Sequence, residues 1–158
     1  MSDFLKQMAD ASAERAARAR RFTDAELDRP VVPLRLGTFD VIAEIKARSP
    51  AEGALASATP DLGARAIDYA RGGAAAISVL TEPSRFDGAL EHLEDVVAAV
   101  PDLPVMRKDF LVDTRQVEEA RASGASGVLL IVTMLPDERL RAMLDAARDL
   151  GLFVLLES

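Results

Sequence analysis

Short runs of apolar and β-branched residues alternate along the chain with longer segments in which apolar positions recur every three or four residues. The short runs predict strands at 41–46, 75–81, 104–108, 127–132 and 152–157. The longer segments predict helices at about 61–71, 89–100, 114–122 and 137–150. Strands that alternate with helices at this spacing predict parallel pairing and right-handed crossovers, and therefore an α/β fold.

The first 35 residues precede this alternation and follow a different pattern. The opening segment reads as an amphipathic helix with Phe4, Leu5 and Met8 on its apolar side, and Thr23 offers a second helix start. We therefore expect a helical extension over residues 1–35 and a domain of alternating strands and helices over residues 36–158.

Charged residues near the ends of the predicted strands share one phase. Side chains alternate along a strand with period two, so Glu44 and Lys46 lie on the same face of the first strand. The same phase places Lys108 and Glu157 on that face, at the ends of the third and fifth strands. Alternate strands of a (β/α)8 barrel supply one layer of inward side chains, whereas a doubly wound sheet would press this face against helices. The phase favours the barrel.

A layer with two ammonium groups and a carboxylate indicates general acid–base chemistry at the carboxyl ends of the strands. Leu80 and Ile131, from the second and fourth strands, would wall this site with apolar groups. A pair between Glu44 and Lys46 would compensate part of the cost of burying both charges. For any one of these residues, the alternative is a strand that simply ends at the surface. Arg107 and Asp109 flank Lys108, and we expect them to point away from the pocket or into the loop, with a salt bridge as the role of both.

Composition narrows the possible partners. Hydrophobic residues make up 49% of the chain and aromatic residues only 4%, so the core is expected to be aliphatic. The net charge of −7 argues against nucleic-acid and membrane-surface partners, but is compatible with a small anionic ligand held by local cations. The absence of cysteine excludes disulfides and thiolate metal sites. No secretory signal and no run of about 20 apolar residues occurs, and we expect a cytoplasmic location.

Four segments resemble indole-3-glycerol phosphate synthase, a TIM-barrel family of tryptophan biosynthesis. VIAEIKARSP is similar to the family signature on the first strand, and GGAAAISVLTEPSRFDGALEHL to the second strand and the loop after it. PVMRKDFLVDTRQVEEARASGASGVLLIV resembles the third and fourth strands, and LGLFVLLES the fifth. The resemblance covers nearly the whole chain in the family order.

The resemblance implies a lyase that closes 1-(2-carboxyphenylamino)-1-deoxyribulose 5-phosphate into indole-3-glycerol phosphate, with loss of carbon dioxide and water and without a metal or organic cofactor. Lys108 would be the general acid of ring closure and Glu157 the acid–base residue of dehydration. Lys46 would hold the substrate carboxylate, positioned by Glu44. The implied substrate-binding residues are Ser49, Ser78, Leu80, Phe86, Phe110, Leu129 and Ile131.

A complete barrel of this kind has about 250 residues, so we expect an incomplete barrel with strands one to five. Its first and fifth strands would then be open edges, which invite self-association or pairing with a missing C-terminal half-barrel. We expect the chain alone to be inactive. Ala51 and Glu52 also stand where the family commonly has a serine and a cation. The alternatives are a non-catalytic half-barrel that serves in binding or assembly, and a paralogue with an altered substrate.

Overall fold

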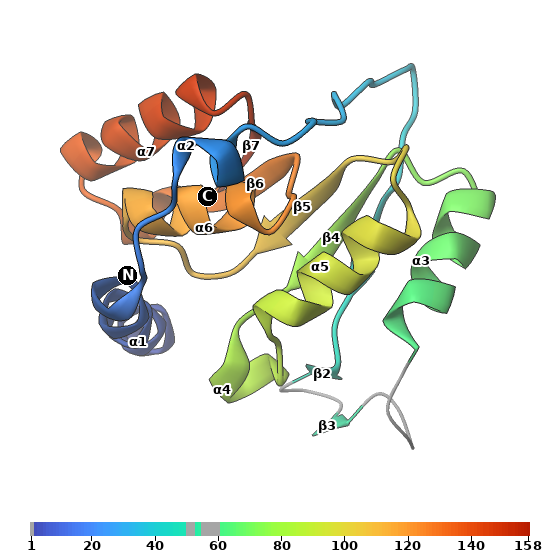
Figure 1. Ribbon diagram of the computed structural model, residues 1–158. Coiled ribbons are helices and arrows are strands. Elements are labelled where there is room, and N and C mark those ends of the chain that lie inside the picture. Colours follow the sequence, from blue (N-terminus) through green and yellow to red (C-terminus); the bar gives the residue numbers. More distant parts are fainter. Residues whose placement is uncertain (1, 50–52, 55–60) are drawn as a thin grey trace.

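The structure is a computed structural model and describes residues 2–49, 53–54 and 61–158 (Figure 1). Its main feature is one parallel sheet of five strands in the order β1-β4-β5-β6-β7. The strands are β1 (Ile42–Ile45), β4 (Ala76–Leu80), β5 (Val105–Lys108), β6 (Gly127–Ile131) and β7 (Phe153–Glu157). Spatial neighbours follow chain order without the reversal of a doubly wound sheet. The predicted strands and the α/β class are therefore confirmed, and the sheet has the order expected of a barrel.

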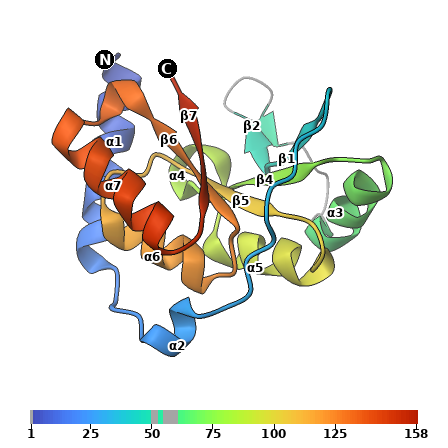
Figure 2. The ribbon, with the colours of Figure 1, turned by 90° about the horizontal axis from the view of Figure 1, so that it is seen from above.

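Four helices connect successive strands and cover one side of the sheet (Figure 2). They are α3 (Leu62–Arg71), α5 (Leu90–Ala99), α6 (Thr114–Ala122) and α7 (Asp137–Asp149). Each begins and ends within about one residue of its predicted range. The sequence signals are local: Asp61 caps α3 by accepting a hydrogen bond from the amide of Ala64, and Asp113 caps α6.

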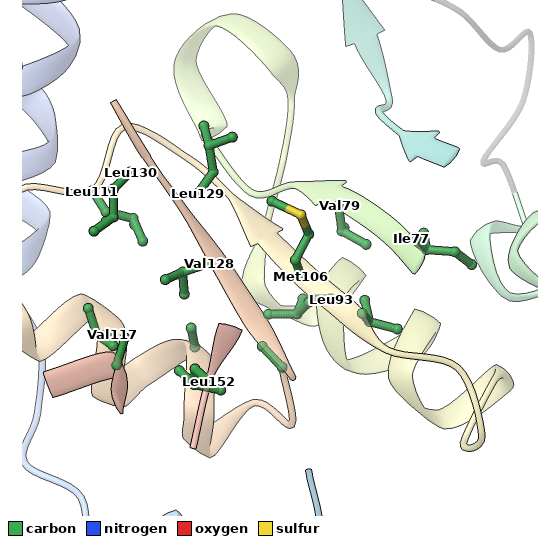
Figure 3. Packing of buried hydrophobic residues seen from close by; sticks show 14 of the residues in the cluster. Ile77, Val79, Leu93, Met106, Leu111, Val117, Val128, Leu129, Leu130 and Leu152 are labelled. Carbon is green, nitrogen blue, oxygen red and sulfur yellow. The ribbon is translucent and has the colours of Figure 1, made fainter. Parts of the chain in front are cut away.

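The core lies between the sheet and these helices. Ile77, Val79 and Leu130 point from the strands into it and are fully buried. Leu93 of α5 and Val117 of α6 meet them from the helix side and are buried as well. Figure 3 shows part of this cluster, with side chains from the strands and from α5 and α6 in contact. The core is aliphatic, as the composition predicted.

The N-terminal extension forms two helices, α1 (Asp3–Arg18) and α2 (Asp24–Leu27). Thr23 and Glu26 form a reciprocal capping box at the start of α2, which confirms the helix start predicted at Thr23. Met8 of α1 is buried and belongs to the main hydrophobic cluster. The extension is therefore packed on the core, and the domain division at residue 35 stays a prediction.

Four short elements of the described structure lie outside the predicted pattern. The antiparallel strands β2 (Arg48–Ser49) and β3 (Gly53–Ala54) form a hairpin after β1. Helix α4 (Pro83–Phe86) lies in the loop expected after the second predicted strand. A 3₁₀ turn, η1 (Val132–Met134), begins at the last residue predicted for the fourth strand. Elements of two to four residues are too short to show a hydrophobic period.

The two outer strands leave apolar side chains accessible. On β1, Ile42 is 36% exposed, and on β7 Leu155 and Leu156 are 41% and 51% exposed. Leu156 lies on the face opposite Glu157, and α7 leaves it half exposed. Within the described ranges the sheet does not close, in agreement with the expected incomplete barrel. No helix in these ranges is long and apolar enough to cross a membrane.

Candidate active site at the carboxyl ends of the strands

The carboxyl ends of the five strands surround a cavity of about 310 Å³. Its walls come from the sheet, the loops after β4 and β5, and α1. The lining residues are Phe4, Leu5, Glu44, Lys46, Leu80, Phe86, Lys108, Asp109, Phe110, Leu129, Ile131 and Glu157. All four predicted catalytic residues are among them, as are five of the predicted substrate-binding residues.

Strand register explains why these side chains meet. Leu80 is paired with Lys108, and Ile131 with Glu157, so each pair faces the same side of the sheet. The predicted phase is therefore correct. Followed across the ladders, however, Lys108 is level with Leu129, and Glu157 lies two residues farther toward the open end. The charged residues line one cavity without standing at one level of the ladder.

Glu44 binds both lysines of the cavity. Its Oε2 atom accepts a hydrogen bond from Nζ of Lys108 at 2.8 Å, and its Oε1 atom lies 3.3 Å from Nζ of Lys46. The pair with Lys46 was predicted. The contact with Lys108 reaches from β1 to β5 across β4, where Ser78 is paired with Glu44 and Leu80 is paired with Lys108. About a third of each of the three charged side chains is exposed.

This arrangement fixes the charge of Glu44. Burial by itself raises the pKa of the Glu44 carboxyl, but the hydrogen bond from Lys108 and then that from Lys46 outweigh burial, and the pKa lies below its usual range. Glu44 is therefore a carboxylate at neutral pH. Each ammonium group carries three N–H donors and uses one on Glu44, so both keep donors for a ligand in the cavity.

An aromatic slot adjoins the charged cluster. The rings of Phe86 and Phe110 have centroids 6.3 Å apart and are tilted by 34°. The ring of Phe4 meets Phe110 edge-on, with centroids 5.8 Å apart. Phe4 and Leu5 had been assigned only to the apolar side of a helix, because their sequence pattern does not show where that helix docks. The ring of Phe110 contacts both of the others and all three rings line the cavity, so the aromatic slot is a wall against which a planar aromatic ligand can pack, not a gap between rings.

A sequence profile described as indole-3-glycerol phosphate synthase matches residues 4–158. The chain belongs to the indole-3-glycerol phosphate synthase family. It is 54% identical over 136 residues to the indole-3-glycerol phosphate synthase of Nocardioides sp., a match that covers 84% of this chain and 52% of the relative. It is 48% identical over 148 residues to indole-3-glycerol phosphate synthase 1 of Streptomyces coelicolor, a match that covers 94% of this chain and 52% of the relative.

A third relative, from Kineococcus radiotolerans, is 55% identical over 117 residues, or 74% of this chain and 42% of the relative. The chain thus spans about half the length of the curated relatives it matches. The sequential parallel sheet is what the first five strands of this TIM-barrel family would form.

Of the residues that the family resemblance placed at the substrate, Ser78 is not among the described residues that line the cavity. Ser78 pairs with Glu44 and Met106 in the ladder, one level below Leu80, and is 5% exposed. The layer above covers it, and its hydroxyl has no hydrogen-bond partner among the described residues. Ser49 lies on β2, and its side chain, like Ala51 and Glu52, falls outside the described part of the structure.

The residues beside Lys108 face the other way. The guanidinium Nη2 of Arg107 lies 3.2 Å from Oδ2 of Asp109, which confirms the predicted salt bridge. Arg107 also binds Glu119 of α6 at 2.7 Å and the hydroxyl of Thr81 at 3.0 Å. Asp109 borders the cavity, yet its carboxylate is directed into this buried network.

In the described ranges there is no group of three or more His, Cys, Asp and Glu side chains placed to hold a metal ion. What the site offers is two amines, two carboxylates and an aromatic slot, a set suited to proton transfer on an anionic aromatic ligand.

Proposed function

We propose that this chain provides the acid–base half of an indole-3-glycerol phosphate synthase site, a carboxy-lyase of tryptophan biosynthesis. The observation that carries the proposal is the Lys46–Glu44–Lys108 cluster beside the aromatic slot, in a chain of this family. The proposed substrate, 1-(2-carboxyphenylamino)-1-deoxyribulose 5-phosphate, combines an aromatic ring, a carboxylate and a phosphate. Its ring would pack against the aromatic wall of the cavity, and its carboxylate suits a lysine.

The reaction needs one proton delivered at the start. The ring carbon that bears the carboxylate attacks the ketone carbon of the sugar chain, and Lys108 gives a proton to the ketone oxygen. Loss of carbon dioxide then restores the aromatic ring. An ammonium group beside the developing oxyanion stabilises it by an amount on the order of 3 kcal/mol in a dry pocket. Glu44 holds Lys108 in place through the 2.8 Å hydrogen bond.

Dehydration completes the indole. The new hydroxyl leaves as water after protonation, and the neighbouring carbon loses a proton to form the second double bond of the ring. Glu157 is proposed as the acid–base residue of this step, and it lies toward the open end of the same cavity. Lys46 is proposed to bind the substrate carboxylate. Phe86, Phe110 and the aliphatic residues Leu80, Leu129 and Ile131 would enclose the ring.

The same proposal covers the part of the relatives that this chain does not match. We propose that turnover requires the part of the relatives that this chain does not match, supplied as a continuation or in trans, because five strands leave two open edges. Self-association through β1 and β7 is the competing use of those edges. A cytoplasmic location is proposed with the activity, since a phosphorylated substrate does not cross a bilayer unaided.

The test replaces Lys108 with methionine in a protein completed to the length of the relatives. Formation of indole-3-glycerol phosphate should fall by about 10²- to 10⁴-fold, the range for loss of a general acid. Lys6→Met, an exposed lysine on α1, is the matched control and should leave the rate unchanged. A Lys108→Met rate within tenfold of the unmodified protein would overturn the assignment. Turnover by the purified, homogeneous 158-residue chain would overturn the requirement for further strands.

A further inference from the structure

One side chain of the N-terminal helix joins two buried carboxylates that come from different loops. Nη2 of Arg15 lies 2.7 Å from Oδ1 of Asp109, and Nη1 lies 3.8 Å from Oε1 of Glu82. The side chain of Asp109 is fully buried and that of Glu82 is 1% exposed, whereas Arg15 is 29% exposed. A cation placed between two buried anions offsets part of the cost of burying both.

Asp109 controls the loop that follows β5. It stands between Lys108 and Phe110, both of which line the cavity. Its Oδ1 atom accepts from the amide of Phe110 at 2.8 Å as well as from Arg15, and its Oδ2 atom accepts from Thr81 at 2.9 Å. The position of this carboxylate therefore sets the direction in which the chain leaves β5.

Glu82 controls the other wall of the slot. It caps α4: its Oε1 atom accepts from the amide of Ser84 at 2.8 Å and its Oε2 atom from the amide of Arg85 at 2.7 Å. Phe86, the last residue of that four-residue helix, faces Phe110. The turn after it is tight, because a Cβ on Gly88 would lie 2.6 Å from the carbonyl oxygen of Leu80. A shift of Glu82 would therefore move Phe86.

Helix α1 has attachments that do not involve Arg15. The amide of Gln116 donates to the hydroxyl of Ser12 at 2.9 Å, and both side chains are buried. Met8 and Ala16 are buried against the rest of the protein. These contacts hold the helix in place, so removal of Arg15 is expected to change the loops beneath it rather than detach the helix.

We infer that Arg15 is a positioning residue of the proposed synthase site, which fixes the loop of Phe86 and the loop of Lys108 and Phe110 relative to each other. This inference rests on the proposed function for its kinetic consequence, but not for its structural one. It assigns the N-terminal helix an electrostatic task, the spacing of the two aromatic walls, in addition to the apolar contact made by Phe4.

The experiment compares Arg15→Met and Arg15→Lys with Arg18→Met, which removes an exposed arginine from the same helix. In the 158-residue chain, nuclear Overhauser contacts between the Phe86 and Phe110 rings should weaken in Arg15→Met and persist in Arg18→Met. In the completed protein, kcat/KM of Arg15→Met should fall by about tenfold to a hundredfold, as for a small misplacement of reacting groups. We expect kcat to fall and KM to rise, because both Lys108 and the aromatic slot move.

Arg15→Lys keeps the charge but loses the two-pronged geometry, so it should recover part of the rate and guards against a methionine variant that fails to fold. Unchanged ring contacts and kinetics in both Arg15 variants would overturn the inference. If the completed, unmodified protein has no synthase activity, the proposed function fails, and the ring contacts still decide the role of Arg15.

Discussion

Consecutive residues of β5 belong to two charged clusters with opposite properties. Lys108 faces the cavity with Glu44 and Lys46, where about a third of each side chain is exposed. Arg107 faces the helix side, and Asp109, which follows β5 and borders the cavity, directs its carboxylate into the same buried network; their side chains are 3% and 0% exposed. The alternation of a strand is enough to separate the two. One cluster keeps free donors and water access for chemistry, and the other is closed and holds the fold.

The difference lies in how completely each group is paired. In the buried network Arg107 donates to Thr81, to Glu119 and to the carbonyl oxygen of Gln116, the last at 3.1 Å. Buried charges that lose a partner are costly, because no water replaces it. In the cavity two lysines share one carboxylate, so among the described residues each ammonium group keeps donors beyond its contact with Glu44.

Asp109→Asn should show the largest difference between the two clusters in their effect on the unfolding free energy. The substitution keeps the size of the side chain but removes the anion that Arg15 and Arg107 share, and breaking such a pair costs about 3 kcal/mol of unfolding free energy. Urea unfolding of the 158-residue chain measures this loss of unfolding free energy. Lys108→Met, one residue away on the open side, should change the unfolding free energy by less than about 1 kcal/mol. Equal losses in the two variants would contradict the division.

The sequence predicts some features of the two charged clusters but not others. The period of two was sufficient to place Lys108 on the cavity side and to pair Arg107 with Asp109, because both follow from one strand. It did not predict that Lys108 reaches Glu44, which depends on the curvature of three strands. The period of two also fixes the face of Ser78 but not its depth, since depth is set by the register between strands.

The difference between sequence prediction and structure is larger for the N-terminal helix α1. Its amphipathic pattern predicted a helix with an apolar side, but an apolar side fits any hydrophobic surface. That Phe4 meets Phe110 and Arg15 meets Asp109 depends on contacts about a hundred residues apart in the chain. Such contacts leave no local period, so neither residue was a candidate for the site.

Thr81→Val should produce a smaller loss within the buried cluster. Valine matches threonine in shape but cannot donate to Asp109 or accept from Arg107, so two buried groups each lose one partner. We expect the unfolding free energy to fall by about 1.5 kcal/mol. Thr133→Val, an exposed threonine in η1, is the control and should be neutral. A neutral Thr81→Val would mean that water or rearrangement satisfies the network, and that it is less closed than the burial indicates.

The cluster of Glu44, Lys46 and Lys108 in the cavity should contribute least to the unfolding free energy, and its contribution can be measured at low pH. Because the pKa of Glu44 is lower in the folded protein than in the unfolded chain, its ion pairs add stability above the unfolded pKa. That stability is lost as the pH falls through the lower, folded value. Glu44→Gln removes this dependence, so its unfolding free energy should fall less steeply than that of the unmodified chain below about pH 4.5. Water reaches a third of these side chains, so the difference should stay within about 1 kcal/mol. Parallel pH profiles would show that the lysines of the cavity do not depend on Glu44 for their pairing.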